Sequence, residues 1–181
     1  MKEFVVGLDM NVAHVLVGMR SEAATNFFLF ITQLGNASFI LIFSLAVAGY
    51  FWWRTHSYFL PFLVSIIGSS LSVTIIKEVI DRARPGTDIA FYAEHLFSFP
   101  SGHAASAVAA FGFVAYALMR MSQGSVTKKL VLGTATILIL LIAFSRLYLG
   151  VHYLSDVIAG ILVGGFWVVV GALLHHYVRR I

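Results

Sequence analysis

The sequence predicts an all-α integral membrane protein: a helical bundle with about five transmembrane helices and an amphipathic N-terminal helix. Of the 181 residues, 60% are apolar and only 11% are charged, whereas about a quarter of the residues of a soluble domain are charged. Several apolar segments approach the roughly 20 residues that a helix needs to cross about 30 Å of hydrocarbon. The chain has no cysteine, which excludes disulfides, thiol catalysis and thiolate metal sites.

Five apolar segments have the length of a membrane span. They cover approximately residues 37–53, 57–76, 100–119, 129–147 and 155–177. Small residues, which let helices approach closely in lipid, recur inside them at Gly68, Ser69, Ser70, Ala104, Ala105, Ser106, Ala109, Ala110, Gly160, Gly164 and Gly165. We therefore expect a single domain over residues 1–181, with a packed transmembrane core over residues 36–181.

Residues 1–35 have a different pattern. Apolar residues recur there at roughly helical spacing and are interrupted by polar residues such as Asp9 and Arg20. This pattern predicts an amphipathic helix that lies at the membrane interface. A second apolar piece, residues 26–34, is too short to span the bilayer. The segment serves either packing or lipid gating, because an amphipathic face alone specifies neither.

The charged residues predict the orientation in the membrane. With five crossings, the loops near 54–56 and 120–129 lie on the same side as the C-terminus. The formal charges of that side are all basic: Arg54, Arg120, Lys128, Lys129, Arg179 and Arg180. All eight acidic residues then fall on the other side. Because Lys and Arg are enriched in cytoplasmic loops, we expect a multi-pass protein of the cytoplasmic (inner) membrane, with its acidic side facing the periplasm or extracytoplasmic space.

Three short polar clusters interrupt the apolar chain, and all of them fall on the predicted outer side. The first contains Lys77 and Arg84, whose seven-residue separation equals two helical turns and predicts one shared helix face. Pro85 is expected to end this helix at Arg84. The guanidinium fork of Arg84 and the ammonium of Lys77 both suit phosphate oxygens. Either cation alone is also compatible with snorkelling to headgroups, and Arg82, which is out of phase with the pair, is interpreted as structural.

The second cluster, Pro100-Ser101-Gly102-His103, opens the third span. The start of a helix offers free N–H groups and the positive end of the helix dipole, so it favours anions. Ser101 can cap the helix or hydrogen-bond a phosphate oxygen, and Gly102 lets the backbone come close. His103 lies in the first turn, where it can protonate a leaving-group oxygen. Taken alone, these residues are equally typical of ordinary helix capping.

The third cluster contains Arg146, His152 and Asp156. Asp156 follows His152 by four residues, the spacing that places two side chains on one helix face. A carboxylate that accepts a hydrogen bond from one imidazole nitrogen fixes the tautomer and leaves the other nitrogen free to attack. On its own, a His–Asp pair at this spacing is also common as a structural contact. Together, however, the three clusters supply cations, imidazoles and a carboxylate suited to one phosphate group.

In this order, Lys77-x6-Arg84-Pro85, Pro100-Ser101-Gly102-His103 and Ser145-Arg146-x5-His152-x3-Asp156 resemble the three signature motifs of the type-2 phosphatidic acid phosphatase superfamily, in its branch of integral membrane lipid phosphate phosphatases. The resemblance covers about residues 60–170. Members of this family usually have six membrane helices, whereas this sequence indicates five and an interfacial N-terminal segment.

The resemblance implies that His152 attacks phosphorus and forms a phosphohistidine, which Asp156 orients. His103 would protonate the leaving oxygen and then activate water. The phosphate oxygens would be held by Lys77, Arg84, Ser101, Gly102 and Arg146. No metal and no other cofactor are expected, because fixed cations neutralise the charge. A metal site made by His103, His152 and Asp156 is the alternative that the ligand types allow.

The outer loop 86–99 is expected to overhang the site. His95 and Tyr92 in this loop are candidates for a headgroup contact or a lid. Anchoring of aromatic side chains at the membrane interface is the other interpretation of this loop.

The resemblance implies a lipid phosphatase that acts on undecaprenyl pyrophosphate, phosphatidylglycerophosphate, phosphatidic acid or a lipid A phosphate. One alternative is a lipid phosphotransferase that uses the same phosphohistidine, and another is a non-catalytic lipid-binding membrane protein. Nucleic acid is not expected as a partner, because the basic residues are dispersed at segment ends rather than clustered. The sequence leaves the headgroup and the oligomeric state open.

Overall fold

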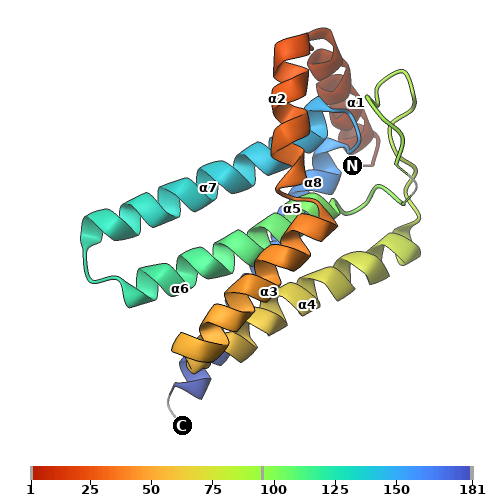
Figure 1. Cartoon of the computed structure of the whole chain (residues 1–181). Coiled ribbons are helices and arrows are strands. Elements are labelled where there is room, and N and C mark those ends of the chain that lie inside the picture. The colour runs from red at the N-terminus through yellow and green to blue at the C-terminus, as the bar shows by residue number, and fades with distance from the viewer. Residues whose placement is uncertain (1, 95, 180–181) are drawn as a thin grey trace.

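The computed structural model describes residues 2–94 and 96–179, and all regular structure within these ranges is helical. The helices are α1 (Lys2–Gly18), α2 (Glu22–Gln33), α3 (Ala37–Arg54), α4 (His56–Ile80), α5 (Gly102–Ala107), η1 (Val108–Gly112), α6 (Phe113–Met121), α7 (Ser125–Tyr148) and α8 (Leu154–Val178) (Figure 1). Five stretches are long and apolar enough to cross a membrane: α3, α4, the continuous run Gly102–Met121, α7 and α8. The predicted all-α bundle of five spans is confirmed.

Helix α4 ends earlier than the first polar cluster suggested. The chain leaves the helix at Asp81, which has a left-handed backbone (φ 47°) and donates its N–H to the Lys77 carbonyl over 3.0 Å. Asp tolerates this conformation better than most residues, because its short side chain is polar. Arg84 therefore lies beyond the helix. Two predictions are therefore wrong: the helix does not extend to Arg84, and Lys77 and Arg84 do not share one of its faces.

The third span contains a π-helical segment, η1, between α5 and α6 (Figure 1). Such segments are rare and often occur near functional sites. Two hydroxyls of α4 contact backbone carbonyls at this part of the span: Ser65 donates to Ala109 over 3.3 Å, and Ser69 donates to Ala105 over 3.5 Å. These contacts hold α4 against the third span at residues that follow His103 within about two helical turns.

Helix α8 packs against α4 most extensively and against α5 through small residues. A Cβ atom at Gly160 would come within 2.5 Å of the Ser101 carbonyl oxygen, and one at Gly164 within 2.4 Å of the Ala105 carbonyl oxygen. The two backbones can approach this closely only because both side chains are absent. The expectation for Gly165 is wrong, since nothing lies within 4 Å of its Cβ position.

Helices α1 and α2 lie together at one end of the bundle, over the ends of α7 and α8 (Figure 1). Helix α1 turns Asp9, Ala13 and Leu16 inward and leaves apolar side chains such as Phe4 and Val15 exposed. The inward position of Asp9 was not predicted, since the sequence showed it only as an interruption of the apolar pattern. The apolar outer face is compatible with an interfacial position, which stays a prediction.

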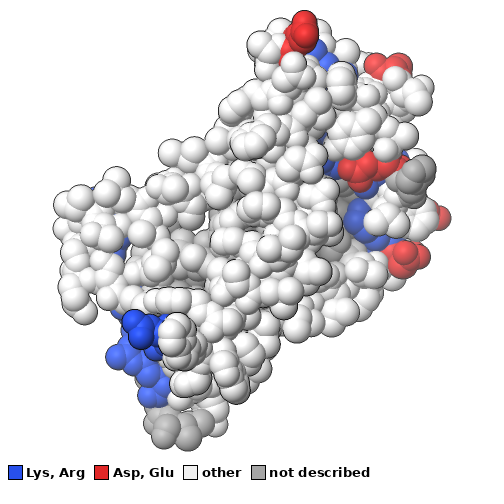
Figure 2. All heavy atoms as spheres, in the orientation of Figure 1, with Lys and Arg blue, Asp and Glu red and all other residues white. Residues whose placement is uncertain are grey.

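The formal charges are distributed unequally along the bundle. In Figure 2, the charged side chains seen at the end that holds the C-terminus are Lys and Arg, whereas at the opposite end Asp and Glu lie together with further Lys and Arg. The polar clusters lie with the acidic residues, near α1 and α2. Between the two ends the surface is apolar, with exposed side chains such as Leu45, Ile75, Leu130 and Leu162. This is the surface expected of a protein that faces lipid tails.

The close approach of α8 to α5 yields a stability prediction with an internal control. In Gly164→Ala the new methyl group meets the Ala105 carbonyl, so we expect a loss of about 1–3 kcal/mol, or roughly 3–10 °C in the unfolding midpoint in detergent. Gly165→Ala gains the same helix propensity without a clash, so its midpoint should not fall. Equal midpoints for the two variants would contradict the packing described here.

Candidate active site

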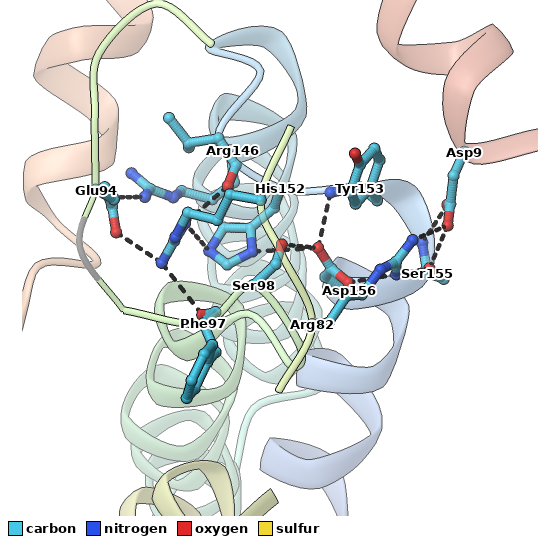
Figure 3. A network of polar contacts seen from close by, with 12 residues as sticks. Asp9, Arg82, Glu94, Phe97, Ser98, Arg146, His152, Tyr153, Ser155 and Asp156 are labelled. Carbon is cyan, nitrogen blue, oxygen red and sulfur yellow. Dashed lines mark hydrogen bonds and ion pairs between the residues drawn. The ribbon is translucent and has the colours of Figure 1, made fainter. Parts of the chain in front are cut away.

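The three polar clusters converge at the acidic end of the bundle. Lys77, Arg84, His103 and His152 line one cavity of about 460 Å³. They come from α4, the loop after it, the first turn of α5 and the turn between α7 and α8. Figure 3 shows His152 at the centre, with Glu94 and Arg146 on one side and Asp156 on the other. Segments far apart in the sequence therefore form one site.

His152 and Asp156 form the expected pair, but His152 lies in the turn before α8, which begins at Leu154, so the prediction that the two share a helix face is wrong. Nδ1 of His152 lies 3.4 Å from Oδ2 of Asp156, somewhat longer than an ordinary hydrogen bond, and has no closer partner among the described residues. Asp156 lies in the first turn of α8, where a carboxylate is favoured by the helix dipole. Its Oδ2 also accepts a hydrogen bond from the Tyr153 N–H (2.8 Å) and one from the Ser98 hydroxyl.

Arg84 indicates which nitrogen of His152 carries the proton. Its Nη1 lies 3.2 Å from Nε2 of His152. A guanidinium can only donate, so Nε2 must accept and the proton must be on Nδ1, facing Asp156. Nε2 therefore has the free electron pair and points toward a cation.

Glu94 bridges two of the predicted phosphate-binding cations. Its Oε2 lies 2.9 Å from Nη2 of Arg84, and its Oε1 pairs with Nη2 of Arg146. Burial alone would raise the pKa of Glu94, but the charges of Arg146 and Arg84 outweigh it and hold this pKa below its usual value. The carboxylate thus remains charged and shows that the two guanidiniums can share one anion.

Arg146 is fully buried at the end of α7. Its Nη1 donates to the hydroxyl of Thr32 over 2.6 Å and to that of Tyr92 over 2.7 Å. A buried guanidinium needs such partners, because an unpaired charge is very costly. Tyr92, a candidate headgroup or lid residue, therefore holds Arg146 in place in this structure.

Lys77 and Arg84 are also held by the loop that follows α4. The ammonium of Lys77 donates to the Phe97 carbonyl. Arg84 donates to the carbonyls of Leu96 (2.5 Å) and Val151 (2.7 Å). These bonds fix both cations at the cavity even though they do not share a helix face.

The second cluster begins α5 at Gly102, with Ser101 at the N-cap position. The Ser101 hydroxyl does not cap the helix; it is buried and has no hydrogen-bond partner among the described residues. Gly102 and His103 line the cavity, and their expected roles in phosphate binding and proton transfer stay predictions. The Ser101 N–H donates to the Asp156 carbonyl over 2.9 Å, which joins the second cluster to the third.

Arg82 was interpreted as structural from its helical phase, but helix α4 has already ended before it. It contacts Asp156 directly, from Nη1 to Oδ1 at 2.6 Å. Its Nη2 lies 2.7 Å from Oδ2 of Asp9 on α1. No local spacing in the sequence links Asp9 to Asp156. The one sequence signal was Asp9 itself, a carboxylate among the apolar residues of the N-terminal segment, because a charge in such surroundings usually has a partner.

The rest of the cavity is uncharged and is lined by apolar side chains and by the hydroxyl residues Ser44, Ser69, Ser70, Thr74 and Ser106. It continues from the cationic end along α3 and α4, where Ile40, Leu41, Ile66 and Val73 line it. One cavity thus combines an anion-binding end with a surface suited to hydrocarbon.

Two further expectations concern the role of His95 and the alternative metal site. His95 lies outside the described residues, so its proposed lid or headgroup role stays a prediction. Within residues 2–94 and 96–179, His103, His152 and Asp156 do not form a cluster that could hold a metal ion. That alternative site is therefore not assembled.

Known proteins share this sequence and fold. The profile of the PAP2 superfamily matches residues 58–180. Phosphatidylglycerophosphatase B of Bacillus subtilis (strain 168) is 37% identical over 137 residues, which make up 74% of this chain and 66% of that protein. The chain thus covers slightly less than two thirds of that relative.

Two solved structures are also similar. The crystal structure of the transmembrane PAP2-type phosphatidylglycerolphosphate phosphatase from Bacillus subtilis has a TM-score of 0.78 at 32% identity, covering 97% of this chain and 85% of that one. Aquifex aeolicus LpxE has a TM-score of 0.73 at 22% identity, covering 91% and 94% of the two chains. The second likeness concerns the fold alone.

The surroundings of His152 predict an unusual titration. Burial lowers its pKa to about 4; the Arg146 and Arg84 charges add to this effect, and the bond to Asp156 only partly opposes it. A free histidine has a pKa of about 6.5, so the imidazole should stay neutral until the pH falls toward 4. NMR of labelled histidines in detergent, assigned with His152→Gln, should show a midpoint below 5. In Arg84→Gln the midpoint should rise, because a nearby positive charge is removed. A parent midpoint between 6 and 7 would contradict this description.

Proposed function

Because the chain belongs to the PAP2 superfamily, we propose that it is a membrane lipid phosphatase that works through a phosphohistidine on His152. The observation that carries this proposal is the single cavity with two unlike ends. Cations and imidazoles line one end, and apolar side chains of α3 and α4 line the other. A phosphate joined to hydrocarbon tails matches both ends at once.

Glu94 supports a position for the phosphate. Its carboxylate lies between Arg84 and Arg146. The phosphate of a substrate would bind the same two guanidiniums at this position. A phosphate has more charge and more oxygens than a carboxylate, so it can displace Glu94. Lys77 and Gly102 line the same cavity and would contact the remaining oxygens.

In the first step, Nε2 of His152 attacks phosphorus from the side opposite the lipid oxygen. The P–N bond forms as the P–O bond to the lipid breaks, and His103 transfers its proton to the leaving oxygen. The bound phosphate favours the protonated form of His103 through its negative charge. Asp156 accepts from Nδ1 and stabilises the positive charge that develops on the imidazole ring.

In the second step, water attacks the phosphohistidine. His103, now neutral, takes a proton from the water as its oxygen bonds to phosphorus, and the P–N bond breaks. Inorganic phosphate leaves, and Nε2 of His152 regains its electron pair. The fixed cations neutralise the charge of both transition states, so we expect turnover without an added metal.

The relatives favour a glycerophospholipid monophosphate as substrate. The sequence relative and the solved structure from Bacillus subtilis are both named as phosphatases of phosphatidylglycerophosphate, at 37% and 32% identity to this chain. We therefore place phosphatidylglycerophosphate first among the candidates, ahead of phosphatidic acid, undecaprenyl pyrophosphate and lipid A phosphates. A phosphotransferase would use the same first step but would deliver phosphate to a second lipid instead of water.

The proposed orientation places the site on the extracytoplasmic side of the cytoplasmic membrane. The support is the collection of Lys and Arg at the opposite end of the bundle (Figure 2), since basic loops remain in the cytoplasm. The chain has no cysteine, so single cysteines can report the side directly. In spheroplasts, an impermeant maleimide should label Asp88→Cys, and it should label Lys128→Cys only after lysis. The reverse pattern would refute this orientation.

The activity itself is tested with a panel of the four lipid classes and a phosphate readout, in detergent with a chelator. We expect phosphate release to be fastest from phosphatidylglycerophosphate. His152→Ala should lower the rate by roughly 10³-fold or more, as loss of a nucleophile does, and should remove any acid-labile phosphoenzyme. His176→Ala, an exposed histidine at the other end, is the matched control and should retain the rate.

Three results would change this proposal. Undiminished activity of His152→Ala would remove His152 as the nucleophile. Loss of activity with the chelator would refute the metal-free mechanism. Consumption of lipid without release of phosphate would identify a phosphotransferase.

A further inference from the structure

We propose that Asp9 in the N-terminal helix α1 is a positioning residue, which holds Arg82 against Asp156 and thereby aligns His152. This inference rests on the proposed role of His152 as nucleophile. It assigns a role in the reaction to a helix that lies outside the region matched by the family profile, residues 58–180.

The contacts form a continuous series across three parts of the chain (Figure 3). Oδ2 of Asp9 lies 2.7 Å from Nη2 of Arg82, and Nη1 of Arg82 lies 2.6 Å from Oδ1 of Asp156. Oδ2 of Asp156 then faces Nδ1 of His152 at 3.4 Å. One guanidinium fork thus joins the two carboxylates, each through a different nitrogen.

Asp9 is also attached to the turn of α8 that carries Asp156. Its Oδ1 accepts from the Ser155 N–H over 2.9 Å, and its Oδ2 accepts from the Ser155 hydroxyl over 2.6 Å. The same hydroxyl receives a bond from Nη1 of Arg82 over 2.6 Å. Asp9, Arg82 and Ser155 therefore make a closed polar ring beside Asp156.

Burial makes this ring hard to explain as a surface contact. Asp9 is only 2% exposed and Asp156 is fully buried. Exposed ion pairs contribute little, but removal of one partner from a buried pair leaves a costly uncompensated charge. Both carboxylates are needed to hold the guanidinium of Arg82 in its orientation, because Asp9 contacts one of its terminal nitrogens and Asp156 contacts the other.

The geometry shows how Asp9 can affect His152 without touching it. Arg82 binds Oδ1 of Asp156, which fixes the rotation of the carboxylate and leaves Oδ2 directed at His152. Without Asp9, Arg82 has lost the anchor on its second nitrogen and can turn away from Asp156. Alignment of the nucleophile would then be lost, whereas the cations that hold substrate, Lys77 and Arg84, would remain.

The test measures kcat and KM on the lipid that the panel identifies as substrate. We expect Asp9→Asn to lower kcat by roughly tenfold, a typical effect of losing an outer positioning contact, while KM stays within about twofold. In an Arg82→Gln background, Asp9→Asn should cause little further loss, because the residue it acts through is already gone. Glu3→Gln, an exposed acid on the same helix, should keep the parent kcat.

Asp9→Glu separates positioning from packing. Glutamate keeps the charge but adds a methylene at a buried position, whereas asparagine keeps the size and loses the charge. Positioning by charge requires the Glu variant to be more active than the Asn variant, and simple packing requires the opposite order. If Asp9→Asn fails to fold, Asp9→Glu is judged alone: a folded Asp9→Glu with measurable kcat supports the proposal, and a folded but inactive one would refute it.

The outcomes separate this inference from the proposed function. If His152→Ala is fully active, the phosphohistidine mechanism fails and the role of Asp9 fails with it. If His152→Ala is inactive but Asp9→Asn keeps kcat within twofold of the parent, only the positioning role is refuted. Equal losses from Asp9→Asn in the parent and Arg82→Gln backgrounds would also refute it, since Asp9 would then act independently of Arg82.

Discussion

The buried carboxylate of Asp156 is the constraint on which the arrangement of the site depends. A charge that is fully removed from water has to be surrounded by donors, and here the donors come from several parts of the chain. Arg82 and Ser98 come from the loop after α4, the Tyr153 N–H from the start of α8, and His152 from the turn before it. Meeting this one requirement draws the loop, the α7–α8 turn and, through Asp9, helix α1 to the same place.

Much of the fold and of the motif chemistry was predictable because it is encoded locally. Apolar length defines a span, and the five spans are confirmed. The pairing of His152 with Asp156 follows from their closeness in sequence, although His152 lies in the turn before α8 and not on its face. Gly102 and His103 at a helix start follow from the order of residues in the second cluster. The family was also identified correctly from the order of the three motifs.

The parts that sequence reasoning missed depend on long-range pairing or on small backbone events. The helical phase placed Arg82 away from the site, but the left-handed turn at Asp81 cancels that phase. Asp9 was recognised only as a polar interruption of the N-terminal segment, because nothing near it in sequence reveals a partner 73 residues away. Glu94 lies in an irregular loop, where no periodicity reports the direction of a side chain.

The charges around the cavity also explain why an anion is favoured there. Arg82, Arg84 and Arg146 pair with the carboxylates of Asp9, Glu94 and Asp156, and Lys77 lines the same cavity as Arg84 and Glu94. Together these groups leave one net positive charge if the histidines are counted as neutral. A phosphate monoester carries about two negative charges at neutral pH, so its arrival in place of Glu94 would balance the four cations. Near a membrane, where unbalanced charge is expensive, the Glu94 carboxylate keeps the site close to neutral and stabilises the fully buried guanidinium of Arg146; in the proposed mechanism, phosphate would take over this role.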